Sequence, residues 1–196
     1  MAWFAQFWHD KTMAKAFVLT GPTAVGKGTV IAEITSLRPD IWFSISATTR
    51  APRPGEVDGV NYHFVTNQEF DRMVRNGHML EWAVVHGLAK YGTPRGPVDT
   101  ALEAGHTVLL EVDLAGARQV RESLPDAEQI FLAPPSWSDL EIRLRGRATE
   151  TEEEQRRRLE TAKVELAAEG EFDHVVVNTT VAQATADLLK LMDQAD

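Results

Sequence analysis

The stretch that most constrains the fold of this chain is an apolar run that leads directly into a glycine-rich loop. The run Phe17-Val18-Leu19-Thr20 is followed by GPTAVGKGT at residues 21–29. In the pattern glycine-x4-glycine-lysine, the glycines let backbone N–H groups turn toward phosphate oxygens, and the following helix adds the positive end of its dipole. A strand before this loop and a helix after it are the context in which it binds a nucleoside triphosphate. We therefore expect a strand over 15–20, a helix over 26–37 and a phosphate-binding loop between them.

The residues expected to bind the triphosphate form one continuous segment. They are Gly21, Pro22, Thr23, Ala24, Val25, Gly26, Lys27, Gly28 and Thr29. Lys27 supplies a positive charge to the β- and γ-phosphates and is expected to be catalytic. The residue after this lysine is usually a serine or threonine whose hydroxyl binds Mg²⁺, but here it is Gly28. That hydroxyl must come from elsewhere or be replaced by water.

Composition limits the classes of protein to which the chain can belong. Its 196 residues, 43% of them hydrophobic, are enough for one domain with inserted subdomains. The absence of cysteine excludes disulfide and zinc–cysteine sites and fits a reducing cytoplasm. No apolar run approaches the ~20 residues of a membrane span. A net charge of −9 argues against a nucleic-acid partner, so a phosphate-binding protein of this charge must gather its arginines locally.

Strand and helix patterns alternate along most of the chain. Five apolar segments read as strands of a core sheet, and helical patterns separate them. These segments are 15–20, 41–47, 107–112, 128–132 and 175–177. The order predicts an α/β fold of the phosphate-loop NTPase type, an open parallel sheet with helices on both faces. Residues 48–95 differ in character, because prolines, glycines and short strand patterns surround one helix near 67–76.

Two acidic residues stand at the end of the predicted strand 107–112, namely Glu111 and Asp113. Ligands of open parallel sheets bind at the carboxyl ends of the strands, where the phosphate loop also lies. An acid at this place commonly holds Mg²⁺, so Asp113 is the expected metal ligand, directly or through water. The alternative is that Asp113 only caps the next helix, since aspartate is a favoured cap.

The segment after residue 47 carries a second set of recognition residues. Arg50 and Arg53 lie three positions apart in a proline-stiffened stretch, and two guanidinium groups can clasp one phosphate. Tyr62 can add a hydroxyl. The carboxylate of Glu81 suits the adjacent N1–H and exocyclic amine of guanine, whereas adenine has an acceptor at N1 and would leave a buried acid unpaired. The segment is therefore predicted to hold a guanine nucleotide.

A third set of residues consists of arginines around a predicted helix–loop–helix. Arg143 and Arg147 lie four positions apart on one helix face, and Arg158 lies on the next helix. Charge runs are usually solvated helix faces. Phosphoryl transfer, however, needs positive charge on the transferring group and exclusion of water. We therefore expect a mobile lid that brings these arginines to the triphosphate.

Taken in order, the motifs resemble the guanylate kinase family, whose members transfer the γ-phosphoryl group of ATP to GMP. The resemblance covers about residues 16–190, and its most specific part is SATTRAPRPGEVDGVNYHF at 46–64. It implies ATP as the phosphoryl donor, Mg²⁺ as the cofactor and GMP or dGMP as the acceptor. The residues that it places around GMP are Ser46, Arg50, Arg53, Glu56, Tyr62, Glu81, Tyr91, Thr93 and Glu111. It makes Lys27, Arg143, Arg147 and Arg158 the groups that stabilise the transferring phosphoryl group.

The resemblance also implies a division of the chain. An N-terminal extension at 1–13 precedes a core built from 14–46, 96–141 and 160–196. A GMP-binding subdomain at 47–95 and a lid at 142–159 are inserted into that core. A monomer and a homo-oligomer are equally compatible with the sequence.

Two rival hypotheses share part of this pattern. A ribose-bisphosphate kinase on the same fold would keep the phosphate loop and the lid arginines but would need no guanine-reading acid. Glu81 and the pair Arg50 and Arg53 argue against it. A non-enzymatic, guanylate-kinase-like module that binds phosphorylated partners would typically have lost the working phosphate loop, whereas Lys27 and its glycines are present here.

Overall fold

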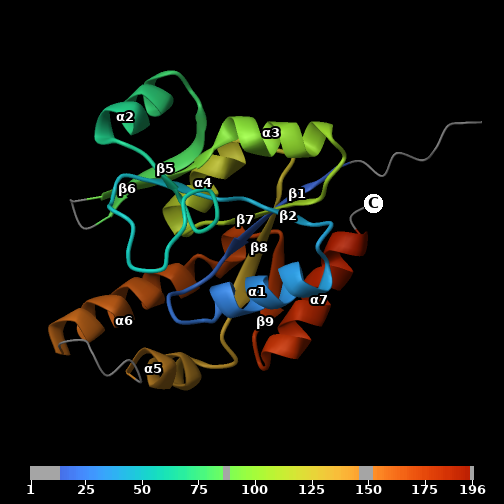
Figure 1. The fold of residues 1–196 in the computed structure, drawn as a ribbon. Coiled ribbons are helices and arrows are strands. Elements are labelled where there is room, and N and C mark those ends of the chain that lie inside the picture. Colours follow the sequence, from blue (N-terminus) through green and yellow to red (C-terminus); the bar gives the residue numbers. More distant parts are fainter. Residues whose placement is uncertain (1–13, 86–88, 146–151, 195–196) are drawn as a thin grey trace, which may run out of the picture.

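The structure is a computed structural model that describes residues 14–85, 89–145 and 152–194. Its core is a five-stranded sheet in the order β2-β7-β1-β8-β9, and every pairing in it is parallel. The strands are β1 (Ala16–Thr20), β2 (Trp42–Phe43), β7 (Val108–Glu111), β8 (Glu128–Ala133) and β9 (His174–Val177). The predicted parallel α/β sheet is thus confirmed (Figure 1).

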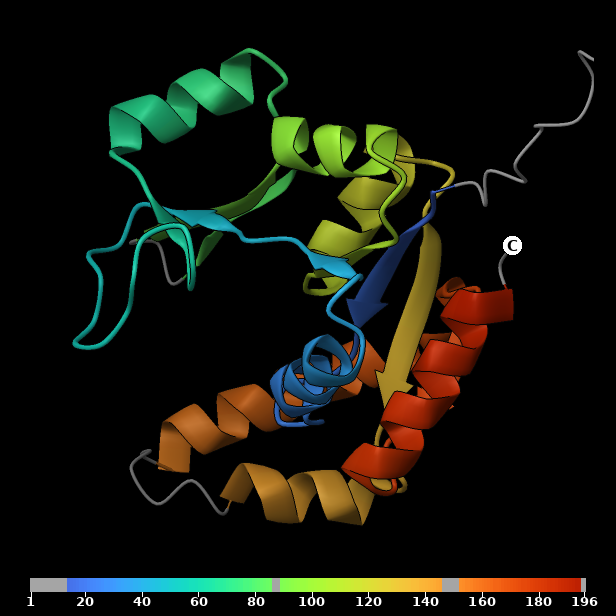
Figure 2. The same cartoon turned by 45° about the vertical axis from the view of Figure 1, so that its right-hand side comes forward.

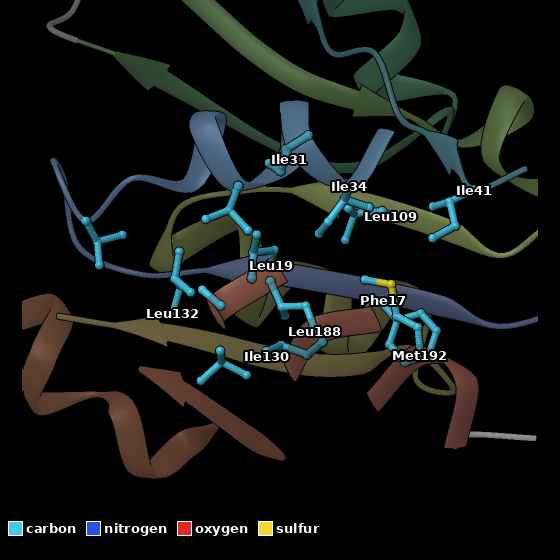
Figure 3. Packing of buried hydrophobic residues seen from close by; sticks show 14 of the residues in the cluster. Phe17, Leu19, Ile31, Ile34, Ile41, Leu109, Ile130, Leu132, Leu188 and Met192 are labelled. Carbon is cyan, nitrogen blue, oxygen red and sulfur yellow. The ribbon is translucent and has the colours of Figure 1, made fainter. Parts of the chain in front are cut away.

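Helices cover both faces of this sheet, as predicted, because the central strand β1 sends apolar side chains to both sides. Phe17 and Leu19 join a cluster with α1, α5, α6 and α7, part of which is drawn in Figure 3. Ala16 and Val18 join a second cluster with α3 and α4. The helices are α1 (Lys27–Leu37), α3 (Arg95–Glu103), α4 (Leu114–Ser123), α5 (Trp137–Arg145), α6 (Glu152–Ala167) and α7 (Val181–Gln194). A short 3-10 helix, Glu169–Glu171, follows α6.

A second, smaller sheet stands to one side of the core (Figure 2). Its order is β4-β3-β6-β5, and β5 and β6 pair in antiparallel fashion. One helix, α2, packs on it through the buried side chain of Phe70. These elements are β3 (Ala47–Thr48), β4 (His63–Phe64), α2 (Asn67–Arg75), β5 (Met79–Val85) and β6 (Ala89–Pro94).

The prediction of one strand over residues 41–47 was wrong, because the chain changes sheets within that stretch. Ser44 N–H donates to Leu109 C=O of the core sheet at 3.0 Å. Two residues later, Ser46 C=O accepts from the N–H of His63, the first residue of β4 in the second sheet, at 2.9 Å. A continuous β pattern in sequence does not reveal which partner strand each residue finds. The crossing places Ser44 and Ser46 between the two sheets.

Candidate active site

The phosphate-binding loop lies against the carboxyl end of β8, and two of its glycines are required by close approach. A Cβ on Gly21, whose φ is 151°, would lie 2.3 Å from Leu132 O. A Cβ on Gly26, whose φ is 106°, would lie 2.8 Å from Asn178 Nδ2. Both backbone conformations favour glycine as well. The backbone path of the loop therefore requires glycine at the two glycine positions of the predicted motif.

Lys27 is the first residue of α1, and its side chain folds back over the loop. Its Nζ donates to Gly21 C=O at 2.6 Å. Burial lowers the pKa of this amine, while the charges of Glu111, Glu165 and Asp113 oppose that shift. These three charges favour the charged form of the Lys27 amine, which burial disfavours.

A cavity of about 370 Å³ lies between the phosphate loop, the carboxyl edge of the core sheet and the second sheet. Seven of the residues singled out from the sequence line it, namely Lys27, Ser46, Tyr62, Glu81, Tyr91, Glu111 and Asp113. The chain has two tyrosines, and both are in this set. Residues far apart in sequence, from both sheets, thus converge on one space.

Glu81 is the buried acid of this cavity, with 8% of its surface exposed. Its Oε1 accepts a hydrogen bond from Thr93 Oγ1 at 2.7 Å. Burial raises the pKa of the Glu81 carboxyl to about 7, and the nearby charge of Asp113 adds to the rise, against the opposing bond from Thr93. A buried carboxyl with a single side-chain donor is poised to accept further N–H groups from a ligand.

The segment that carries Glu81 is fixed from α4. The Gln119 amide pairs with the backbone of Trp82, accepting from its N–H at 3.1 Å and donating to its C=O at 3.0 Å. Gly116 lies behind the carboxyl, and a Cβ there would be 3.0 Å from Glu81 Oε2. The position of Glu81 is therefore set by contacts between the second sheet and α4.

Arg50 lies at the edge of the cavity and is held by four hydrogen bonds, to Tyr91, Ala51 and Glu56. Its Nε donates to Tyr91 Oη at 3.1 Å, and its guanidinium lies 4.9 Å from the centre of the Tyr62 ring. Both terminal nitrogens donate to the Glu56 carboxylate at 2.6 Å. These contacts orient the guanidinium before any ligand arrives.

In this structure, Arg50 and Arg53 do not form a joint binding site for one phosphate, and Glu56 does not face the cavity. Glu56 accepts from Arg53 N–H at 2.7 Å as well as from Arg50, which lowers the pKa of its carboxyl to about 2. The Arg53 side chain is exposed. Glu56 thus orients Arg50, and neither Glu56 nor Arg53 lines the cavity.

The acids at the end of β7 have distinct environments. Asp113 Oδ1 accepts from Gly116 N–H at 2.7 Å and caps α4, which confirms the helix-cap interpretation. The same side chain lines the cavity, so capping does not remove it from the site. Burial raises the pKa of the Glu111 carboxyl, against the opposing charge of Lys27. Among the described residues no three acidic or histidine side chains gather into a metal cage.

The three arginines expected to act on the transferring group are placed differently. Arg143 on α5 donates to Val25 C=O of the phosphate loop at 3.1 Å and to Asn178 C=O at 3.4 Å. Arg158 is half-buried on α6. Arg147 and residues 146–151 of the predicted lid lie outside the described residues, as does the extension at 1–13.

Two residues at the phosphate loop were missed in the sequence. The Asn178 side chain donates to Val25 C=O at 2.8 Å, across 153 positions of sequence. Glu165 accepts from Thr23 N–H at 3.0 Å, across 142 positions. No local pattern signals such contacts. Glu165 sits in a charged helical stretch that reads as a solvated face.

Comparison with known proteins agrees with this architecture. A profile of the guanylate kinase family matches residues 13–195. The guanylate kinase of Leifsonia xyli subsp. xyli is 62% identical over 175 residues, which are 89% of this chain and 69% of that protein. That of Cutibacterium acnes is 58% identical over 175 residues, 89% of this chain and 88% of that protein.

A solved structure is similar as well. The crystal structure of guanylate kinase from Anaplasma phagocytophilum superposes with a TM-score of 0.72 at 31% identity, covering 93% of this chain and 86% of that one. In the described part of the chain, no helix has the length and apolar character needed to cross a membrane. Its sequence, its fold and the profile match agree, and the chain belongs to the guanylate kinase family.

Proposed function

We propose that the cavity is the GMP site and the phosphate loop the ATP site of this kinase, which transfers the γ-phosphoryl group of ATP to GMP. The observation that carries this assignment is the buried carboxyl of Glu81 in the cavity, opposite the loop that holds Lys27. Guanine offers N1–H and an exocyclic amine side by side, and a carboxylate accepts both. Adenine offers an acceptor at N1, which would face the Glu81 oxygens without a proton to share.

The phosphate of GMP is proposed to bind where Arg50 meets the two tyrosines. The guanidinium of Arg50 is already oriented by Glu56, and the hydroxyls of Tyr62 and Tyr91 lie in the same part of the cavity. Arg53 is exposed, and we assign it to the same phosphate from its place three positions after Arg50. Ser46 adds to the polar lining, and Thr93 acts on the proposed base site through its hydrogen bond to Glu81.

On the ATP side, the chain supplies backbone N–H groups and Lys27, while Arg143 and Arg158 are proposed to stabilise the charge of the transferring group. Little covalent chemistry falls to the protein, because holding two nucleotides in line and neutralising charge accomplish most of the acceleration. Arg143 must release Val25 C=O in order to reach the phosphates. We assign Arg147 the same role from its place in the predicted lid.

The donor set at the end of β7 fits Mg²⁺. This ion is usually held by one or two carboxylates together with substrate phosphates, so no protein cage is needed. Asp113 would hold it, directly or through water, with Glu111 beside Lys27 as a second acid. When bound, Mg²⁺ neutralises negative charge on the transferring phosphates.

We propose that the chain is divided into a core, a GMP-binding subdomain and a lid, with the bounds that the sequence implies. Residues 14–46, 96–141 and 160–196 form the core, 47–95 the GMP-binding subdomain and 142–159 the lid. The second sheet, which runs from β3 to β6, supports the subdomain assignment. We also propose that the protein is located in the cytoplasm, where both nucleotides are available. We propose no nucleic-acid partner for it.

The test is an ATP-coupled assay over a panel of nucleoside monophosphates. We expect rapid phosphorylation of GMP and dGMP and poor phosphorylation of AMP and UMP. Comparable rates on AMP would contradict the role of Glu81. Activity on a ribose bisphosphate, without activity on GMP, would support the rival kinase instead.

A further inference from the structure

Glu165 reaches the phosphate-binding loop from α6, outside the cavity. Its Oε2 accepts a hydrogen bond from Thr23 N–H at 3.0 Å. Its neighbours Lys163 and Val164 are exposed, whereas Glu165 is half-buried. A carboxylate loses water at a high cost unless a partner compensates, so this contact with the loop is specific rather than incidental.

The charge of Glu165 also acts on Lys27. Burial raises the pKa of the Glu165 carboxyl, while the bond from Thr23 and the charge of Lys27 oppose the rise. Glu165 in turn favours the charged form of Lys27, together with Glu111 and Asp113. Those two acids line the cavity and Glu165 does not. Lys27 therefore has acidic neighbours on the cavity side and on the side of α6.

Both helices that flank residues 146–151 hold the same loop. From α5, Arg143 donates to Val25 C=O. From α6, Glu165 accepts from Thr23 N–H, two positions earlier. Figures 1 and 2 show α6 beside the loop between β1 and α1. A donor and an acceptor of the loop backbone are thus paired with charged side chains from these two helices.

Glu165 shares a helix face with an arginine assigned to the transferring group. Arg158 lies seven positions earlier in α6, nearly two full turns, so the two side chains leave the helix in almost the same direction. A contact that fixes Glu165 against the loop also fixes the rotation and the axial position of Arg158 relative to it.

We propose that Glu165 is a positioning residue for phosphoryl transfer. It holds the Thr23 turn of the phosphate loop and sets the position of α6, and with it Arg158, against the ATP phosphates. It acts through Thr23 N–H and through the charge of Lys27. The proposal rests on the proposed function of the loop as the ATP site.

The test compares Glu165→Ala, Glu165→Gln and Glu165→Asp with Glu160→Gln, a control on the exposed part of the same helix. Loss of a charge-assisted hydrogen bond corresponds to about tenfold. We expect Glu165→Ala to lower kcat/KM for ATP by about tenfold in total, through a higher KM for ATP and a lower kcat, with KM for GMP unchanged. Glu165→Gln recovers part of the loss because its amide oxygen can accept from Thr23 N–H. Glu160→Gln is expected to match the unchanged protein.

Two further measurements distinguish a positioning role of Glu165 from a role in folding: direct binding of a fluorescent ATP analogue and thermal unfolding. If Glu165→Ala does not fold, Glu165→Asp keeps the charge, withdraws it by one methylene and is expected to show the same selective loss for ATP. The proposal would be overturned if the affinities for ATP and GMP fell equally and in step with a lower Tm. It would also be overturned if KM for ATP and kcat of all three Glu165 variants equalled those of Glu160→Gln. An unchanged protein that binds the analogue but does not phosphorylate GMP would contradict the proposed function alone.

Discussion

The proposed donor side and the proposed acceptor side of this active site are built in different ways. The phosphate loop is one run of nine residues, 21–29, and it offers mainly backbone N–H groups and one lysine. The acceptor side draws its side chains from β5, β6, the 50–62 segment and the end of β7. A backbone site recognises phosphate in any nucleotide, whereas a side-chain site can distinguish one base from another. Specificity is therefore expected to reside in the second sheet and rate in the loop.

The sharpest test of this comparison is to remove the positive charge of Lys27, the one lysine of the phosphate loop. Lys27→Met is expected to lower kcat by about 10³-fold, because charge that develops on the transferring group loses its nearest fixed cation. GMP affinity should stay within a few-fold. The measurements are steady-state kinetics, GMP titration by calorimetry and circular dichroism. An unchanged kcat in a folded variant would remove the loop lysine from the mechanism.

On the acceptor side, Glu81→Gln is expected to weaken GMP binding by about 10²-fold, because the amide presents an N–H group where guanine needs an acceptor. ATP affinity should remain nearly unchanged. Calorimetry with each nucleotide measures both, and Glu69→Gln on the exposed face of α2 is the matched control. If both affinities fell together, Glu81 would be a structural residue.

Lowering the pH is expected to weaken the binding of GMP through Glu81 but not the binding of ATP. The pKa of Glu81 is raised to about 7, and guanine requires its ionised form. Below that pH a proton must leave before GMP binds, so the Kd for GMP should rise about tenfold for each unit of pH lost. The Kd for ATP has no such dependence on Glu81.

The GMP phosphate itself titrates near pH 6, so the control is the ratio of Kd values between the unchanged protein and Glu81→Gln from pH 5 to 8.5. The advantage of the unchanged protein should be full above pH 7 and disappear as the pH falls. A constant ratio would show that the carboxyl does not titrate in this range.

The smallest expected effect concerns Gly28, where the family of phosphate loops usually has a hydroxyl. A Cβ at Gly28 would meet nothing within 4 Å, so Gly28→Ser and Gly28→Ala both fit without rearrangement. Serine is expected to lower the Mg²⁺ concentration for half-maximal activity by a few-fold, and alanine to leave it unchanged, because only serine adds an oxygen ligand. Activity measured against free Mg²⁺ at saturating ATP distinguishes them. Equal effects of both variants would indicate a change in α1 instead.

Sequence patterns recovered the donor side almost completely. The loop, the strand before it and the helix after it are contiguous, so local spacing contains their geometry. The same holds for Asp113, whose capping of α4 involves a residue three positions away. The five core strands were also found, apart from the false continuation of β2 into β3.

For the proposed acceptor side, the sequence named most of the polar side chains that share the cavity but not how they are arranged. Arg50 and Glu81 were recognised, yet Glu56 proved to be the partner of Arg50 rather than part of the cavity wall. The raised pKa of Glu81 depends on burial against α4 and on the charge of Asp113, both of which are more than 30 positions away in sequence.

The amino-acid order alone thus indicated the glycine-rich loop, the parallel core and Glu81 as a candidate binding residue, because each depends on neighbours in sequence or on the chemistry of one side chain. Folding specified which distant residues meet. Glu165 and Asn178 contact the loop across 142 and 153 positions. Such pairings follow from how helices and sheets pack, and packing depends on the whole apolar core rather than on any local pattern.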